Sequence, residues 1–539
     1  MADAHLWMGG AVFTGRRFHE SLLIDGKEIV AVGSLSETRR LSPTGTEVHD
    51  LAGGMLIPGL IDAHLHLAEL ALAERGLDLT RASSVADLVE GVRAWGSSHP
   101  HGPIVGRGWN LPSLASDQWP TRRDLDRASA DRAVLLYHAS GHAVIVNSAA
   151  LSLLRIGRDS PDPSGGRVGR ERDGEPNGQL FENATTVAAE LAHQAATADP
   201  AAFDSVARQL SSLGITSVGT MNTSATELAG LATCSARGGF RVRVRAYLSL
   251  ARFAALRPGE LDRLVPETEF LCVRGVKGFA DGAFGTRTAW LFDPYRDDPS
   301  TSGMAVHRMD ELVEGFRRAR ELGLTPAIHA LGDRGVDRAL DALEASRLRG
   351  QHSVDRLDHA GLVPPSLLPK LKRVCPIAVV QPSFVWSDHW LLERLGPDRS
   401  RYTYPFRTIR DAGLTLAGSS DAPFDVLDPW RGLRAAVHRQ SPEGRSANPS
   451  PSEALTVSEA FEMCTLGGAR ALQEKGLGEL APGGLADFVW VRAPDLERAL
   501  EQGAAGVEET WVDGVRAHFT GAAGADQPSA NGSSAQGKR

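Results

Sequence analysis

Two histidines, His64 and His66, end an apolar run that begins just after Pro58-Gly59. A β-strand repeats every two residues, so both imidazoles point to the same face. Neutral imidazole is the commonest protein ligand for zinc and related metals. The pair therefore predicts half of a metal site at the end of a buried strand. Taken alone, it would also fit two buried histidines that bind no metal.

Length and composition limit the class of protein. The chain has 539 residues, 42% of them hydrophobic, with 57 Gly and 30 Pro. This predicts one large domain with additions rather than one ordinary domain. The net charge of -8 comes without a basic stripe, which argues against nucleic acid as a partner. The four cysteines are far apart and predict neither a disulfide framework nor a cysteine zinc site.

The N-terminal segment and the hydropathy predict the compartment. Residues 1–7 lack the basic region and apolar core of a secretory signal. No run of the chain approaches the roughly 18 apolar residues that cross a bilayer. We therefore expect a cytoplasmic protein with no membrane partner.

The two ends of the chain share one sequence pattern. Residues 1–54 and 483–517 read as short alternating strands separated by tight turns. We expect them to meet in one small β-sandwich domain. The tail at 520–539 is rich in Gly, Ala, Ser and Asn and is predicted to be disordered.

Residues 55–482 have a different pattern, in which short apolar strands alternate with predicted helices. The expected strands are Leu56–His64, Ile215–Val218, Val242–Leu248, Val273–Phe279, Leu324–His329, Ser353–His359, Ile377–Gln381 and Leu414–Ser419. Eight such strands favour an α/β fold of the (β/α)₈ type, a TIM-like barrel. The first gap is far longer than a βα connection needs, so an inserted α/β subdomain is expected at about 70–205.

Further residues able to bind a metal stand at the ends of later strands. They are Lys277, His329, His359 and Asp421. A barrel of this type has its active site at the carboxyl ends of its strands. The gaps between these residues each hold at least one βα unit, so one ligand per strand is feasible.

The ordered set of HxH, Lys, His, His and Asp resembles the amidohydrolase superfamily of metal-dependent hydrolases. Further segments resemble the branch (amidohydrolase 3) that contains N-substituted formamide deformylase. They are Gly106-Arg107-Gly108-Trp109-Asn110, Gly141-His142-Ala143, Asn147-Ser148-Ala149-Ala150-Leu151, Lys277-Gly278-Phe279-Ala280-Asp281-Gly282, His329-Ala330-Leu331-Gly332-Asp333-Arg334 and Ser420-Asp421-Ala422-Pro423. The resemblance spans roughly residues 5–516.

The resemblance implies one or two divalent ions, zinc being expected. His64 and His66 would bind the more buried ion with Asp421, and two further histidines, His329 and His359, would bind a second. An ammonium group has no lone pair and would repel a cation. Lys277 could thus bridge two metals only as a carbamate formed with carbon dioxide. Alternatively, it pairs with Asp281 or another acid beside the site.

The expected catalytic groups are Asp421 and His142. A carboxylate that touches both metal and water can take a proton and return it to the leaving nitrogen, whereas a loop aspartate can also serve as a helix N-cap. His142 is a candidate oxyanion donor or substrate ligand. Substrate contacts are expected from Trp109, Asp281 and Gln381, although each could equally be a packing residue.

Two departures from the branch pattern bear on specificity. Asp358 stands where a glutamate is common, which we expect to be a mild change. Gly219-Thr220-Met221-Asn222 replaces the more usual His-Asp after the second strand, at a position facing the pocket. The second change makes a relative's specificity a poor guide to this chain.

The leading functional hypothesis is a hydrolase that cleaves a C–N bond of amide or formamide type in a small organic substrate. The same site could instead deaminate a ring or open a cyclic amide or carbamate. A non-catalytic small-molecule-binding protein on the same barrel is the alternative of another class. The large surface leaves room for a homodimer.

Overall fold

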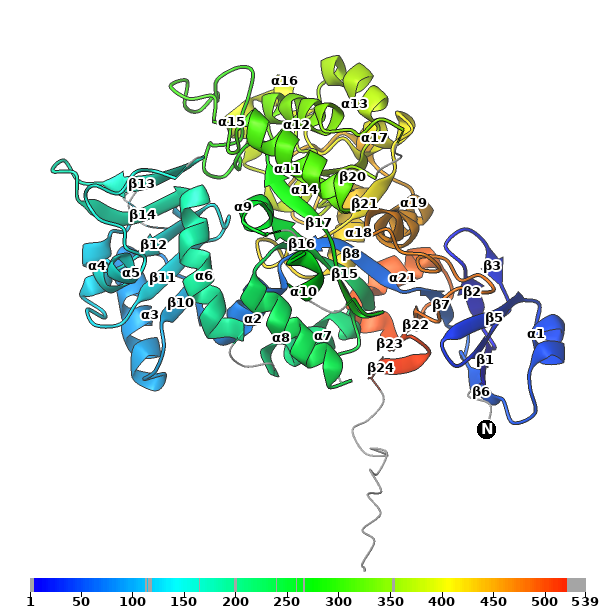
Figure 1. Cartoon of the computed structure of the whole chain (residues 1–539). Coiled ribbons are helices and arrows are strands. Elements are labelled where there is room, and N and C mark those ends of the chain that lie inside the picture. Colours follow the sequence, from blue (N-terminus) through cyan, green and yellow to red (C-terminus); the bar gives the residue numbers. More distant parts are fainter. Residues whose placement is uncertain are drawn as a thin grey trace, which may run out of the picture.

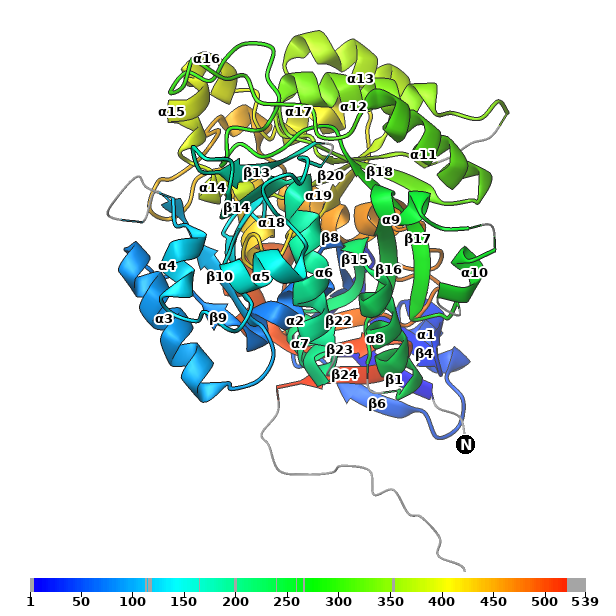
Figure 2. The same ribbon diagram turned by 60° about the vertical axis from the view of Figure 1, so that its left-hand side comes forward.

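A computed structural model describes residues 4–520 except 112–113, 115–118, 164, 198–200, 239, 258, 265–266 and 351–353. The part of the predicted disordered tail that follows Thr520 lies outside the described residues. The centre of the fold is a parallel sheet of eight strands that curves into a nearly closed barrel (Figure 2). Its strands in order are β8 (Leu60–Leu65), β15 (Ile215–Thr223), β16 (Arg243–Ser249), β17 (Leu271–Phe279), β18 (Thr325–Ala330), β19 (Arg356–His359), β20 (Ile377–Val380) and β21 (Leu416–Gly418).

The first and last strands meet through backbone and side-chain contacts. The Asp421 N–H, just after β21, donates to the His64 carbonyl at 2.9 Å. The Ser420 N–H donates to the Asp62 carboxylate of β8 at 3.1 Å. These contacts place the end of the eighth strand against the HxH segment of the first.

The first predicted strand, Leu56–His64, is two strands in the structure. β7 (Met55–Pro58) pairs with β2 (Ala11–Phe13) and β22 (Phe488–Val491), and only β8 joins the barrel. Gly59 separates them, and a Cβ there would lie 2.3 Å from Thr216 Oγ1. Only glycine fits this close approach, so the chain can pass from one sheet to the next.

Helices cover the outside of the barrel. They are α7 (Ala201–Ser212), α8 (Ala225–Ala236), α9 (Leu250–Ala254), α10 (Leu261–Leu264), α11 (Met309–Glu321), α12 (Asp333–Ala345), α13 (Leu368–Val374), α14 (Phe384–Ser387), α15 (Leu391–Leu395), α16 (Pro397–Ser400), α17 (Phe406–Asp411), α18 (Pro429–His438), α19 (Val457–Glu462) and α20 (Gly468–Ala471). In α12, Val336, Ala339, Leu340 and Leu343 are all fully buried. Their spacing of three and four residues puts them on one face, which packs on the barrel.

The strands near the two ends of the chain form two smaller sheets, one from N-terminal strands alone and one from both ends (Figure 1). One has the order β5 (Glu28–Gly33), β4 (Ser21–Asp25), β1 (Ala4–Met8) and β6 (Glu47–Asp50). The other has the order β24 (Val515–Phe519), β23 (Val507–Val512), β22, β7, β2 and β3 (Phe18–His19). Trp7, Leu56, Phe488 and Trp511 belong to a common apolar core, which joins these sheets. Helix α1 (Leu35–Leu41) packs on β5, β4 and β1, and α21 (Leu496–Gln502) follows β22 in the chain and contacts α18 and α19.

A third smaller sheet lies between the first two barrel strands in sequence and beside the barrel in space (Figure 1). Its strands in order are β13 (Gly166–Arg170), β14 (Pro176–Glu182), β12 (Ala143–Val146), β11 (Val134–His138), β10 (Ile104–Trp109) and β9 (Leu77–Asp78). The helices of this segment are α2 (Leu67–Arg75), α3 (Val85–Ser98), α4 (Arg122–Asp126), α5 (Ser148–Leu153) and α6 (Asn183–Thr197).

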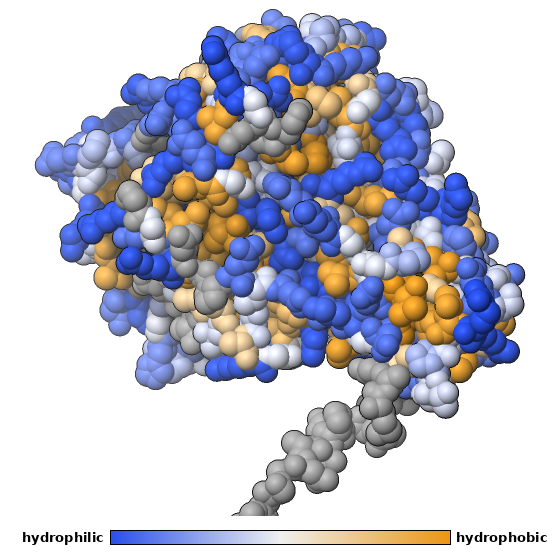
Figure 3. All heavy atoms as spheres, turned by 45° about the vertical axis from the view of Figure 1, so that its right-hand side comes forward, coloured by the Kyte–Doolittle hydropathy of each residue, from blue (hydrophilic) through white to orange (hydrophobic). Residues whose placement is uncertain are grey.

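The surface is mixed in character. Figure 3 shows one face on which hydrophilic atoms predominate and hydrophobic atoms gather in separate areas. Among the described residues, no helix has both the length and the apolar composition that crossing a membrane requires.

Candidate metal centre

The HxH pair lies where the first barrel strand ends. His64 is in β8, and His66 is one residue past it, at the N-cap of α2, with its backbone still extended. The strand alternation therefore continues through both histidines, and their rings lie 5.5 Å apart. His64 is only 1% exposed.

Asp421 completes a three-residue cluster with this pair. Asp421 Oδ1 lies 3.2 Å from His64 Nε2 and 3.2 Å from His66 Nε2. One donor atom from each residue lies within 4.8 Å of the others, and all three residues are buried. Two imidazoles and a carboxylate that converge in this way form a donor set suited to a divalent metal such as zinc.

Asp358 holds the first histidine from behind. Its Oδ2 lies 3.1 Å from His64 Nδ1, and its Oδ1 lies 3.2 Å from the Arg356 guanidinium. A carboxylate beside Nδ1 favours the tautomer that leaves the Nε2 lone pair facing Asp421. Arg356 is fully buried and holds the pKa of Asp358 well below its usual value, against the effect of burial. Asp358, which stands where a glutamate is common in the branch, therefore supports a histidine of the cluster.

Lys277, in β17, is buried beside the same carboxylate. Its Nζ lies 2.5 Å from Asp358 Oδ2. This ion pair is one of the two arrangements that the sequence left open, with Asp358 as the acid. Burial lowers the pKa of the lysine, although Asp358 acts in the opposite direction.

His329 is the next-to-last residue of β18 and His359 is the last residue of β19, and their ring centroids are 4.4 Å apart. His359 Nδ1 lies 2.7 Å from Gln381 Oε1, while the Gln381 amide nitrogen donates to Ser419 Oγ. His329 Nε2 lies 3.0 Å from the Gly282 carbonyl. Each carbonyl oxygen fixes a proton on the ring nitrogen that it faces. The other nitrogen of each ring is thus left with a lone pair for a metal.

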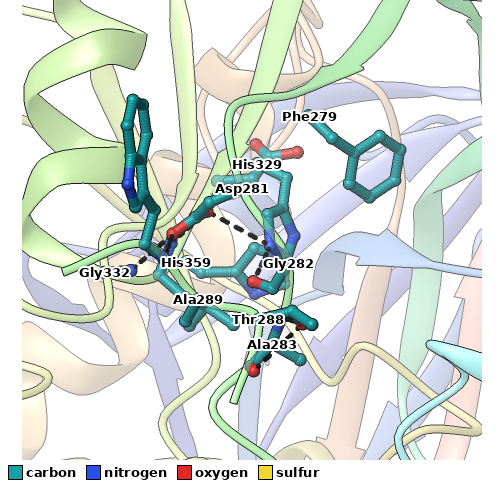
Figure 4. Close-up of polar contacts among 12 residues, drawn as sticks. Phe279, Asp281, Gly282, Ala283, Thr288, Ala289, His329, Gly332 and His359 are labelled. Atoms are coloured by element: carbon teal, nitrogen blue, oxygen red, sulfur yellow. Dashed lines mark hydrogen bonds and ion pairs between the residues drawn. The ribbon is translucent and has the colours of Figure 1, made fainter. Parts of the chain in front are cut away.

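Asp281 shapes the loop that follows β18 (Figure 4). Its carboxylate is fully buried and accepts from the N–H groups of Leu331, Gly332 and Trp290. Burial raises the pKa of Asp281 to about 7, and these hydrogen bonds act against the rise. Its Oδ1 is 3.7 Å from His329 Nε2. Asp281 therefore acts on the loop and on His329.

A cavity of about 600 Å³ opens above the cluster. His64, His66, Lys277, His329, His359 and Asp421 all contribute to its wall, as does His142. Its apolar wall includes Leu250, Phe279, Phe284, Leu331, Phe384, Trp390 and Phe424. The volume suits a small organic ligand with an apolar part.

The three predicted substrate contacts, Trp109, Asp281 and Gln381, are not among the described residues that line this cavity. Trp109 is fully buried in the inserted segment, where its indole N–H donates to the Leu136 carbonyl at 3.0 Å. Gln381 is fully buried and acts on His359. Met221 and Asn222, in contrast, do line the cavity.

His142 enters the cavity from the inserted segment. Its Nδ1 lies 2.7 Å from Glu182 Oε2, and Glu182 also accepts from the Thr288 hydroxyl at 2.6 Å. Burial lowers the pKa of His142, but Glu182 outweighs this effect and raises it overall. No sequence pattern marked Glu182, because it is 40 residues from His142 and ends an ordinary strand.

A parallel barrel with histidine and carboxylate donors at the carboxyl ends of its strands is the arrangement expected of a metal-dependent hydrolase. The chain belongs to the amidohydrolase family, whose sequence profile matches residues 47–518.

Individual relatives agree with this assignment. YtcJ of Bacillus subtilis, whose name assigns it to the amidohydrolases, is 34% identical over 509 residues, covering 90% of this chain and 93% of YtcJ. The N-substituted formamide deformylase of Arthrobacter pascens is 28% identical over 92% of this chain and 94% of its own. The crystal structure of an uncharacterized metal-dependent hydrolase from Pyrococcus horikoshii has a TM-score of 0.77 and 28% identity, covering 94% of this chain and 100% of that one.

Proposed function

We propose that this amidohydrolase cleaves a C–N bond of amide or formamide type in a small organic substrate. The observation that carries the proposal is the position of Asp421, whose carboxylate lies 3.2 Å from both HxH imidazoles at the wall of a substrate-sized cavity. The similarity to a formamide deformylase supports the choice of bond.

The donor set fits a divalent ion, and we propose zinc. His64, His66 and Asp421 would hold one ion, and His329 with His359 a second. When bound, such an ion lowers the pKa of water toward neutrality and polarises a carbonyl. The histidines suit this role because burial lowers the pKa values of His66 to about 4 and of His359 to about 3, so both are neutral near pH 7.

Two side chains would move or stabilise charge during the reaction. Burial raises the pKa of Asp421, but His64 and His66 outweigh it and hold the carboxyl group ionised. An ionised Asp421 can accept a proton from the attacking water and return it to the leaving nitrogen. Glu182 raises the pKa of His142 and so favours its protonated form, which can donate a hydrogen bond to the oxygen that gains negative charge.

For Lys277 we propose the carbamate form. The neutral amine attacks carbon dioxide, a C–N bond forms and one proton is released, which leaves an anionic group able to bridge two metals. The lowered pKa of the buried lysine increases the fraction of the lysine that is in the neutral amine form. The ion pair with Asp358 must then open, and Arg356 remains within 3.2 Å to balance the Asp358 charge.

A panel of N-formyl and N-acyl amines tests the proposed bond. We expect release of the amine and the acid by the metal-loaded protein, loss of turnover after chelation, and recovery with added zinc. Release of ammonia from ring substrates would instead favour the deaminase alternative. Tight binding of one compound by a metal-loaded but inert protein would favour the binding protein. Full turnover after complete removal of metal contradicts the hydrolase mechanism.

Arg252 gives a more specific expectation for the substrate. It lines the cavity just after β16, and its Nε is buried without a hydrogen-bond partner in the described part of the chain. Lys277, the other Lys or Arg among the described lining residues, has Asp358 as a counter-ion. A guanidinium whose Nε–H is buried without an acceptor, at the wall of a cavity, favours an anionic partner that can accept from it. We propose that the substrate carries a carboxylate or similar group that Arg252 binds.

Arg252→Gln should raise KM for N-acyl amino acids about tenfold, the equivalent of ~1.4 kcal/mol, with little change in kcat. The matched neutral substrates are the N-acyl amino acid amides, in which an amide replaces the carboxylate. For these substrates, KM should be the same in Arg252→Gln and in the wild type. Arg257→Gln, a nearby surface variant, serves as the control. Equal effects on charged and neutral substrates would contradict the anion-binding role while leaving the hydrolase mechanism intact.

A further inference from the structure

A second group of residues able to bind a metal lies on the terminal strands, outside the barrel. It consists of His5 in β1 and of Glu47 and His49 in β6. In this parallel pair, His5 is opposite Glu47 and Trp7 is opposite His49. Alternate residues of a strand share a face, so the side chains of all four project to the same side of the sheet.

The ligand atoms already have the separations of a metal site. His5 Nδ1 lies 3.0 Å from His49 Nε2 and 3.4 Å from Glu47 Oε2, and His49 Nε2 lies 3.8 Å from Glu47 Oε1. Ligands at the usual zinc–nitrogen distance of about 2.0–2.1 Å in a tetrahedron are roughly 3.3 Å apart. An ion could therefore enter with only small shifts of these side chains.

Aromatic neighbours hold the two imidazoles in this arrangement. The His49 ring stacks on Trp7, with centroids 4.6 Å apart and planes 12° from parallel. The His5 ring meets the edge of Trp511 at 5.3 Å. Trp7 is fully buried, so the support is part of the core shared by the terminal sheets. Preorganised ligands bind a metal at a lower cost in side-chain entropy.

The group is also accessible to solvent. The side chains of His5 and His49 are 15% and 20% exposed, and that of Glu47 is 66% exposed. Burial lowers the pKa of His49, and Glu47 acts against this effect. Neutral imidazole is the form that binds a metal.

We propose that His5, Glu47 and His49 form a second site for a divalent transition metal of the zinc type. Three protein ligands leave a fourth position for water. β6 is the edge strand of its sheet, with the order β5-β4-β1-β6, and pairs only with β1 there. A metal at this point would clamp the edge strand to its neighbour, a structural role separate from the barrel site.

The test is the number of zinc ions that the whole protein holds at micromolar free zinc. We expect His49→Ala to hold one ion fewer per chain than the wild type, with an unchanged rate on any active substrate. His99→Ala is the matched control, because His99 also stacks on a tryptophan, Trp95, at 3.9 Å, but belongs to no three-residue ligand group among the described residues. It should keep the wild-type zinc content.

Glu47→Gln is the second variant. The Glu47 side chain is exposed, so this substitution removes no core packing that folding requires. It should weaken zinc binding at the extra site and reduce the increase in melting temperature that added zinc produces. Equal zinc content in the wild type and both variants overturns the proposal and leaves only a hydrogen bond between the two imidazoles. The zinc content is measured per chain, so this outcome is independent of whether the barrel site is catalytic.

Discussion

Asp421→Asn should lower kcat by about 10²–10⁴-fold while leaving most of the bound metal in place. The asparagine amide oxygen can occupy the position of Asp421 Oδ1, 3.2 Å from His64 and His66, and can still coordinate. The side chain can no longer accept a proton, however. Steady-state rates on an active substrate, together with metal content per chain, separate the two roles.

Two variants serve as controls for this result. Asp425→Asn changes an aspartate of the same loop that accepts from Ser387 but does not line the cavity among the described residues, and it should keep nearly full activity. His66→Ala should lose metal and activity together. A rate near that of the wild type in Asp421→Asn would assign the proton transfer to another residue.

Lys277→Ala should lose the second metal as well as nearly all activity. The proposed carbamate would be the bridge between the two ions, and alanine offers no ligand in its place. Short carboxylic acids can enter the space left by the lysine and supply two oxygens. Added acetate or propionate should therefore restore part of the metal content and part of the rate. Intact mass under native conditions should also show one added carboxyl group in the wild type.

The competing arrangement predicts a different result. If Lys277 only neutralises Asp358, Arg356 still faces that carboxylate in Lys277→Ala, and carboxylic acids should restore nothing. Lys370→Ala is the matched control, since Lys370 is an ion-paired lysine on α13 whose partners are Asp337 and Asp341. Its metal content and rate should stay unchanged. An unmodified Lys277 beside one fully ligated ion would contradict the bridged site.

The fold could be predicted largely because barrel strands carry a local signal. Each of the eight strands coincides with or overlaps an apolar run that the sequence marked, from β8 to β21. The error at Leu56–His64 arose because both sheets accept the same apolar residues. β7 and β8 are separated by their different pairing partners and by the close packing of Gly59 against Thr216, which are contacts between residues far apart in the chain.

Side chains with both apolar and polar parts were harder to place. Trp109 stood in a motif-like segment, and a tryptophan can serve equally in a core or in a pocket wall. Its indole N–H found a backbone carbonyl inside the inserted segment. Gln381 likewise acts through His359, because its amide oxygen faces His359 Nδ1. Neither role could be read from residue type and spacing alone.

The sequence by itself determined the donor types and their order, because strand alternation puts His64 and His66 on one face and parallel strands end at one rim. The tertiary structure alone decided which partner each donor has. Asp358 lies behind His64, and Glu182 lies behind His142, 40 residues away in the chain. Arg252 Nε was left without a hydrogen-bond partner among the described residues. Such pairings depend on contacts between distant segments, and local patterns carry no signal for them.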